Sequence, residues 1–170
     1  MSSEDTNSGL PFDAARFRGA LGMFATGVTI VTACGEDGTP VGLTANSFNS
    51  VSMAPPLILW SLSLRAGSMP VFRAGSHYAI NILAAGQREL AERFASSRRE
   101  NRFDGVGWEA GVGGAPVLAG AVAVFGCFNR SRYEEGDHVT FVGQVERCSH
   151  TPGAAPLLFH GGRFYTELPL

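Results

Sequence analysis

Short apolar runs rich in β-branched residues, separated by glycine and proline, dominate the 170 residues of this chain. About seven such runs can be counted, and the turn residues between them are typical of antiparallel strands that follow one another. The 22 glycines and 9 prolines favour many turns over a helical bundle. The sequence therefore predicts a mainly β fold, an antiparallel barrel with a few peripheral helices at its ends.

The periodicity of the apolar residues predicts the order of the elements. Two helices are expected over 12–25 and 87–95, and a shorter one begins near Ser68. Asp13 is the predicted N-cap of the first helix. The phenylalanines of that helix are expected in the core: Phe12, Phe17 and Phe24. The predicted strands cover 28–34, 41 to the prolines at 55–56, 57–63, 77–83, 121–133, 138–148 and 161–167.

One domain, over 12–170, accounts for this pattern, and the polar residues 1–11 indicate a disordered tail before it. Hydrophobic residues make up 45% of the chain and charged residues 16%, which is enough apolar material for a sizeable core. The net charge is −2 and no basic run occurs, so we expect no nucleic-acid partner. Every basic residue is an arginine, which excludes P-loop and Schiff-base chemistry because both need lysine.

The cysteines and the N-terminus bear on the cellular compartment. Three cysteines without a C-x-x-C spacing favour neither a disulfide framework nor a cysteine-rich zinc site, and they fit a reducing cytoplasm. The N-terminal residues lack the basic start and apolar run of a signal peptide. No apolar stretch approaches the roughly 20 residues needed to span a bilayer, so no membrane segment is expected. The four histidines are scattered, and no metal site is predicted.

The stretch 43–52 is unusual for a buried strand, because small polar side chains stand where valine and isoleucine are common. An edge strand with one face in water is the simpler interpretation. However, the polar positions are nearly consecutive, so they fall on both faces of a strand. A ligand with a phosphate tail and a flat polar ring would require such a row. Hydroxyl and N–H groups can hold its phosphate without lysine.

Ten short motifs lie in one order between residues 12 and 168: Gly27–Thr32, Gly42–Phe48, Ser50–Ser52, Pro55–Leu57, Asn81–Leu83, Phe94–Ala95, Arg102–Phe103, Gly136–His138, Gly143–Val145 and Pro156–Tyr165. Each is weakly specific alone. Together, at this spacing, they resemble the flavin reductase family, the small reductase components of two-component flavin-dependent monooxygenases.

The resemblance implies a split, Greek-key β-barrel that binds FMN or FAD, as a homodimer with the flavin near the subunit interface. It implies hydride transfer from NADH or NADPH to the flavin, and delivery of the reduced flavin to a partner monooxygenase. Arg102 would make the charged phosphate contact. The other residues that the resemblance places around the flavin are Thr44, Ala45, Asn46, Ser47, Phe48, Ser50, Ser61, Leu62, Ser68, Phe94, Ala95 and Phe103.

The motif Gly136–His138 resembles the family's turn on the nicotinamide side. We therefore expect His138 to act in catalysis where NAD(P)H docks, with Asp137 and Tyr165 beside it. Without the resemblance, His138 would be interpreted as a solvent-exposed turn residue. A core aromatic strand would explain Tyr165 equally well.

Two alternatives stay open. Another flavin enzyme on the same barrel, such as an oxidase resembling the pyridoxamine-phosphate oxidase group, would be expected to carry basic residues for a phosphorylated substrate, and lysine is absent. A non-enzymatic flavin- or haem-binding module would need, for haem, a histidine inside an apolar strand, whereas His77 and His138 stand at strand ends. The choices between FMN and FAD and between NADH and NADPH also stay open, although Arg130 and Arg132 lie near the nicotinamide turn.

Overall fold

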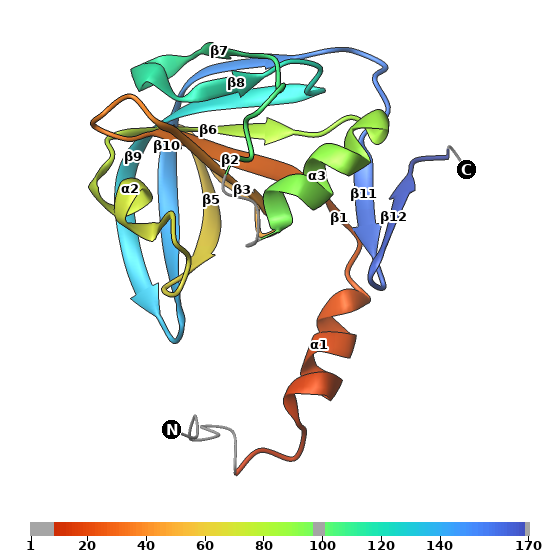
Figure 1. Cartoon of the computed structure of the whole chain (residues 1–170). Helices are drawn as coiled ribbons and strands as arrows, with labels where there is room; N and C mark the ends of the chain where they lie inside the picture. The colour runs from red at the N-terminus through yellow and green to blue at the C-terminus, as the bar shows by residue number, and fades with distance from the viewer. Residues whose placement is uncertain (1–8, 97–100, 169–170) are drawn as a thin grey trace.

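The computed structural model describes residues 9–96 and 101–168 and confirms a mainly β fold. Seven antiparallel strands form the main sheet, in the order β3-β2-β6-β9-β10-β5-β4. Figure 1 shows this sheet curling into a barrel. Its strands are β2 (Thr29–Cys34), β3 (Pro40–Ala45), β4 (Asn49–Met53), β5 (Pro56–Ser63), β6 (His77–Ile82), β9 (Ala123–Glu135) and β10 (His138–His150).

The barrel is split along one seam. Strands β3 and β5 approach each other, but no ladder of backbone hydrogen bonds joins them within the described residues. Residues 46–48 leave β3 at this seam, and the Ser61 N–H of β5 donates to Ser47 Oγ at 2.9 Å. A side chain therefore tethers the segment after β3 to the part of β5 that extends beyond its pairing with β4. The seam keeps room for a cleft there.

An aromatic cluster fills the barrel. The rings of Trp60 and Phe141 stack with centroids 4.8 Å apart, and Phe72 and Tyr78 meet Trp60 edge-on. All four side chains are buried, and burying a ring of this size stabilises the fold by about 1.5–3 kcal/mol. Trp60 thus points into the core. Gly143 on β10 faces Tyr78 so closely that an added Cβ would overlap the Tyr78 hydroxyl.

Two of the predicted helices are confirmed. The helix α3 (Arg88–Ala95) follows the 3₁₀ turn η1 (Ala85–Gln87) and buries Ala91 and Phe94 against the barrel. The short helix α2 (Met69–Ala74) begins after Ser68 and ends at Gly75, as the turn residues predict. These two helices lie on either side of β3, and they position the walls of the clefts described below.

The first helix departs from the prediction. The helix α1 covers Ala14–Gly22, shorter than 12–25, with the N-cap confirmed because the Arg16 N–H donates to Asp13 Oδ1 at 2.7 Å. The prediction that Phe12, Phe17 and Phe24 lie in the core is wrong. Phe17 on α1 is 51% exposed, and Phe12 and Phe24, which flank the helix, are 37% and 77% exposed. Figure 1 shows that α1 stands away from the barrel, so its apolar side chains do not reach the core of the single chain.

The remaining differences concern short elements. The expected strand from 41 onward is broken, because β3 ends at Ala45 and β4 begins at Asn49. Six short elements were not expected: β1 (Thr26–Gly27), the 3₁₀ turn η1, β7 (Trp108–Ala110), the 3₁₀ turn η2 (Val112–Gly114), β8 (Pro116–Leu118) and β11 (Leu157–His160). Strand β11 pairs with both β1 and β12 (Arg163–Thr166) in a small sheet. Most of the predicted tail, residues 1–8, lies outside the described residues.

Candidate functional site

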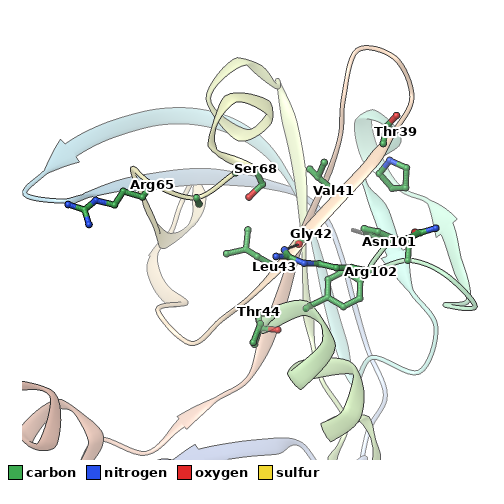
Figure 2. Close-up of a pocket in the computed structure, with 15 residues that line it drawn as sticks. Thr39, Val41, Gly42, Leu43, Thr44, Arg65, Ser68, Asn101 and Arg102 are labelled. Carbon is green, nitrogen blue, oxygen red and sulfur yellow. Dashed lines mark hydrogen bonds between the residues drawn. The ribbon is translucent and has the colours of Figure 1, made fainter. Parts of the chain in front are cut away.

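Two clefts meet along β3. The seam cleft, of about 410 Å³, lies between the end of β3 and the end of β5 and is lined by residues 43–47, 61–63, Ala66 and His138. The hairpin groove, of about 890 Å³, is lined by residues 39–44, 65–68, 94–95 and 101–103. The two share Leu43, Thr44 and Ala66, so they form adjoining parts of one depression. Figure 2 shows the hairpin groove.

Hydrogen bonds fix the walls of the seam cleft. The Thr29 hydroxyl donates to the Ala45 carbonyl at 2.7 Å, and Ser47 Oγ accepts from the Ser61 N–H at 2.9 Å. The hydroxyls of Ser61 and Thr140 share a hydrogen bond of 3.1 Å. The predicted residues of this part are brought together here: Thr44, Ala45, Asn46, Ser47, Ser61, Leu62 and His138. The result is a cleft with polar groups on a mainly apolar lining, and these hydrogen bonds hold its walls in place before any ligand enters.

Arg102 lines the hairpin groove. Its guanidinium donates to the Gly42 carbonyl at 2.7 Å and to the Ser96 carbonyl at 2.9 Å. The Phe94 and Phe103 rings pack edge-on behind it, 4.9 Å between centroids. Gly42 allows this approach, since a Cβ there would lie 2.8 Å from the Phe94 ring. The predicted residues that line this groove are Thr44, Ser68, Phe94, Ala95, Arg102 and Phe103.

The electrostatic character of the hairpin groove is positive. Arg65 and Arg102 line it, and no carboxylate does so among the described residues. A guanidinium beside hydroxyls and backbone amides is the donor set that a phosphate prefers.

His138 begins β10 and lies at the mouth of the seam cleft. Its Nδ1 shares a hydrogen bond of 2.6 Å with Asp137 Oδ1, and the Leu64 N–H donates to the Asp137 carbonyl at 2.9 Å. The hydrogen bond from His138, and then its charge, lower the pKa of the Asp137 carboxyl. The His138 side chain is about half exposed, so it is both anchored on one side and accessible on the other.

Three predicted residues lie elsewhere. Phe48 lines a third cavity, of about 460 Å³, that shares Asn46 and Ser47 with the seam cleft and reaches Phe24. Ser50 is exposed on the edge strand β4, and Tyr165 is exposed on β12 beside His160. None of these three residues lines the seam cleft or the hairpin groove. Their roles in binding stay predictions.

Sequence reasoning also missed residues around the site. Phe159 lines an apolar cleft of about 470 Å³ that adjoins the seam cleft at residues 44–46. Phe164, which belongs to the motif Pro156–Tyr165, lines the same cleft. Leu43, Ala66 and Asn101 line the two main clefts. The apolar run that ends at Phe159 was the one available signal, since it is as long as a short strand.

The family follows from a direct comparison. A family model described as "Flavin reductase like domain" matches residues 21–167. The chain belongs to this flavin reductase family. The match confirms the resemblance that the motifs carry, and it spans nearly all of the described residues.

Individual flavin reductases agree with this assignment. The FMN reductase (NADH) SmoA of Agrobacterium fabrum is 45% identical over 148 residues, 87% of this chain and 83% of that protein. The structure of the Streptomyces globisporus NADH:FAD oxidoreductase SgcE6, in complex with NAD and FAD fragments, superposes with a TM-score of 0.87 at 41% identity, covering 92% and 94% of the two chains. HsaB of Rhodococcus jostii, the reductase subunit of a flavin-dependent monooxygenase, is 36% identical over 152 residues, which are 89% of this chain and 77% of HsaB.

The residues of this flavin reductase fit a flavin. The two adjoining clefts have volumes in the range of pockets that bury a cofactor-sized ligand. The seam cleft offers a slot with ordered polar edges for a flat ring, and the hairpin groove offers Ser68 and Arg102 for a phosphate. Within the described residues, no three His, Cys, Asp or Glu side chains are grouped as a metal site would need. Nor does any described helix have the length and apolar character to cross a membrane.

Proposed function

We propose that this chain transfers a hydride from NADH to FMN or FAD and passes the reduced flavin to a separate flavin-dependent monooxygenase. One observation carries the proposal. A slot with polar edges opens directly into a groove lined by two arginines and no carboxylate among the described residues. That arrangement suits a flat ring followed by a phosphate. The names of SmoA and SgcE6 support the reaction, and that of HsaB supports the monooxygenase partner.

The chain's own residues bind and orient in this reaction. A bound flavin supplies an acceptor for the hydride at its N5 atom, opposite the C4 atom of the nicotinamide. Thr44 to Ser47, with Ser61 and Leu62, hold the ring in the seam cleft. Ser68 and Arg102 hold the phosphate, and Ala95 and Phe103 close the groove behind it. The protein needs to hold two flat rings about 3–3.5 Å apart, and a strong acid or base is not required.

His138 borders the nicotinamide. Its hydrogen bond to Asp137 fixes the imidazole at the mouth of the seam cleft, from which the second ring must enter. Replacing His138 with alanine should raise the KM for NADH or lower kcat, while the dissociation constant of the flavin changes little. Steady-state kinetics with flavin titrations in parallel test this, and wild-type kinetics in the variant would remove the role.

A second copy of the chain covers the exposed apolar face of α1. Phe17 and Leu21 on that helix, and Phe24 just after it, are at least half exposed, and burial of such side chains by a partner stabilises the assembly. The cavity at Phe48 also reaches Phe24, so a dimer would close it. All three cysteines are free thiols, which fits a cytoplasmic enzyme.

The test is a grid of NADH and NADPH against FMN and FAD, followed at the nicotinamide absorbance band. Rapid loss of NADH that depends on added flavin is expected. Absence of turnover in all four combinations would overturn the proposal and leave a binding role.

A further inference from the structure

A separate cleft, of about 320 Å³, lies between the small sheet of β7 and β8 and the strands β9 and β10. We call it the cap cleft, and it is lined by residues 109–112, Val117, Val124, Gly126 and 147–149. It shares no lining residue with the seam cleft or the hairpin groove. Figure 1 shows β7 and β8 at the end of the molecule opposite α1. Pockets that hold small ligands have volumes of about 300–1,000 Å³, so the cap cleft has room for a small molecule.

The inside of the cap cleft is apolar. Val112, Val117 and Val124 line it. Gly126 allows Val112 to approach the backbone of β9, because a Cβ at this glycine would lie 2.9 Å from Val112 Cγ2. Contact with such a lining removes apolar surface from water, which favours a ligand that carries an apolar group.

Each wall of the cap cleft carries one charge. In an antiparallel pair, residues directly opposite each other have side chains on the same face of the sheet. Glu109 is opposite Val117, and Arg147 is opposite Gly126. Val117 and Gly126 line the cleft, so the two charged residues stand on the cleft faces of their sheets. The cleft therefore presents a carboxylate from one wall and a guanidinium from the other.

A β-bulge decides which charge β10 presents to the cap cleft. The pairing of β10 with β9 shifts between Val145 and Arg147, so Arg147 and not Glu146 lies opposite Gly126. Glu146 instead contacts His77, with 3.3 Å between Glu146 Oε2 and His77 Nε2. Without the shift, carboxylates would stand on both walls. With it, the walls have opposite charges.

Both charges are available to a ligand. The side chains of Glu109 and Arg147 make no hydrogen bond or ion pair, with each other or with any other of residues 9–96 and 101–168. A guanidinium matches the two oxygens of a carboxylate with two parallel N–H donors, and an ammonium group offers three N–H donors to a carboxylate such as that of Glu109. A molecule with both a carboxylate and an ammonium group satisfies both walls at once.

We propose that the cap cleft binds a free amino acid with an aliphatic side chain, at a site separate from the flavin site. Its carboxylate pairs with Arg147, its ammonium group pairs with Glu109, and its side chain contacts Val112, Val117 and Val124. This inference does not depend on the proposed reductase function, because the cap cleft has no residue in common with the two clefts assigned to the flavin.

The experiment titrates the isotope-labelled full chain with L-leucine and follows the backbone amide signals by NMR. Saturable shifts are expected at Val112, Arg147 and Ser149, with a dissociation constant of about 1 mM or tighter, while the signals of Thr44 and Asn46 in the seam cleft stay in place. Two analogues of leucine each lack one charge: 4-methylpentanoate has no ammonium group, and 3-methylbutylamine has no carboxylate. Each should bind about tenfold more weakly than leucine. Glycine, which keeps both charges but has no apolar side chain, should also bind about tenfold more weakly.

Variants of the two charged residues complete the test. Arg147→Gln and Glu109→Gln should each weaken leucine binding about tenfold, and neither should alter flavin binding. Arg163→Gln removes an exposed arginine on β12, outside the cap cleft, and should leave leucine binding unchanged. Absence of saturable shifts around the cap cleft would overturn the proposal. Binding of either singly charged analogue as tight as that of leucine, or an equal loss in Arg163→Gln, would overturn it as well.

Discussion

Replacing Gly143 with alanine should destabilise the barrel by about 3 kcal/mol. The added Cβ would overlap the Tyr78 hydroxyl and lie 2.9 Å from Tyr78 Cζ and 3.0 Å from Cys127 Cβ. Inserting a methyl group into a packed core costs about 1–3 kcal/mol, and the upper end applies because the Tyr78 ring is fully buried against Trp60. For a domain of this size the melting temperature should fall by about 6–12 °C. Unfolding in guanidinium measures the free energy of unfolding and thermal unfolding measures the melting temperature, each followed by circular dichroism.

The control removes the atom that the new methyl group meets. The Tyr78 hydroxyl is buried and has no hydrogen-bond partner within the described residues, so Tyr78→Phe should leave stability unchanged or raise it. In that background Gly143→Ala should cost about half as much, since the contacts with Cζ and Cys127 remain. An alanine variant as stable as wild type, or the same loss in both backgrounds, would refute the packing argument.

Three further changes test the site and the assembly. Arg102→Ala should weaken flavin binding about tenfold or more by calorimetry, since bonds to a charged group are the strongest kind, and Arg102→Lys should not restore it. His138 lowers the pKa of the Asp137 carboxyl from its usual value of 3.8. The hydrogen bond between the Asp137 carboxylate and His138 is therefore fully kept above pH 3.8, and it is lost only as the pH falls through the lowered pKa. Titration of Asp137 should therefore cause no change in the KM for NADH between about pH 5 and 8. Asp137→Asn should raise the KM for NADH over this whole range. Phe17→Asp should halve the particle mass in light scattering, and an unchanged mass would contradict the dimer.

Helix periodicity predicts which face of a helix is apolar, but it does not predict what covers that face. The pattern over 87–95 led to α3, whose Ala91 and Phe94 are buried as expected. The same kind of pattern over 12–25 predicts α1, whose Phe17 and Leu21 are exposed in the single chain. Strands β7 and β8 have three residues each, too few for alternation to be recognised.

The site residues that follow one another along a single stretch could be predicted from the sequence. The site residues that come together from distant parts of the chain were harder to predict. Thr44 to Ser47 could be found from their unusual polarity alone. The place of Arg102 depends on its hydrogen bond to the Gly42 carbonyl, sixty positions away, which no local pattern encodes. The resemblance places Ser50 around the flavin, whereas the break at residues 46–48 puts Ser50 on β4, outside the lining of both clefts.

A crystal structure of the protein with FAD is the most direct test of the flavin site. The account predicts the ring in the seam cleft beside Ser47 and His138, and the phosphates at Ser68 and Arg102. A flavin bound instead in the apolar cleft between Phe159 and Phe164, with its phosphates in solvent away from Arg102, would contradict it.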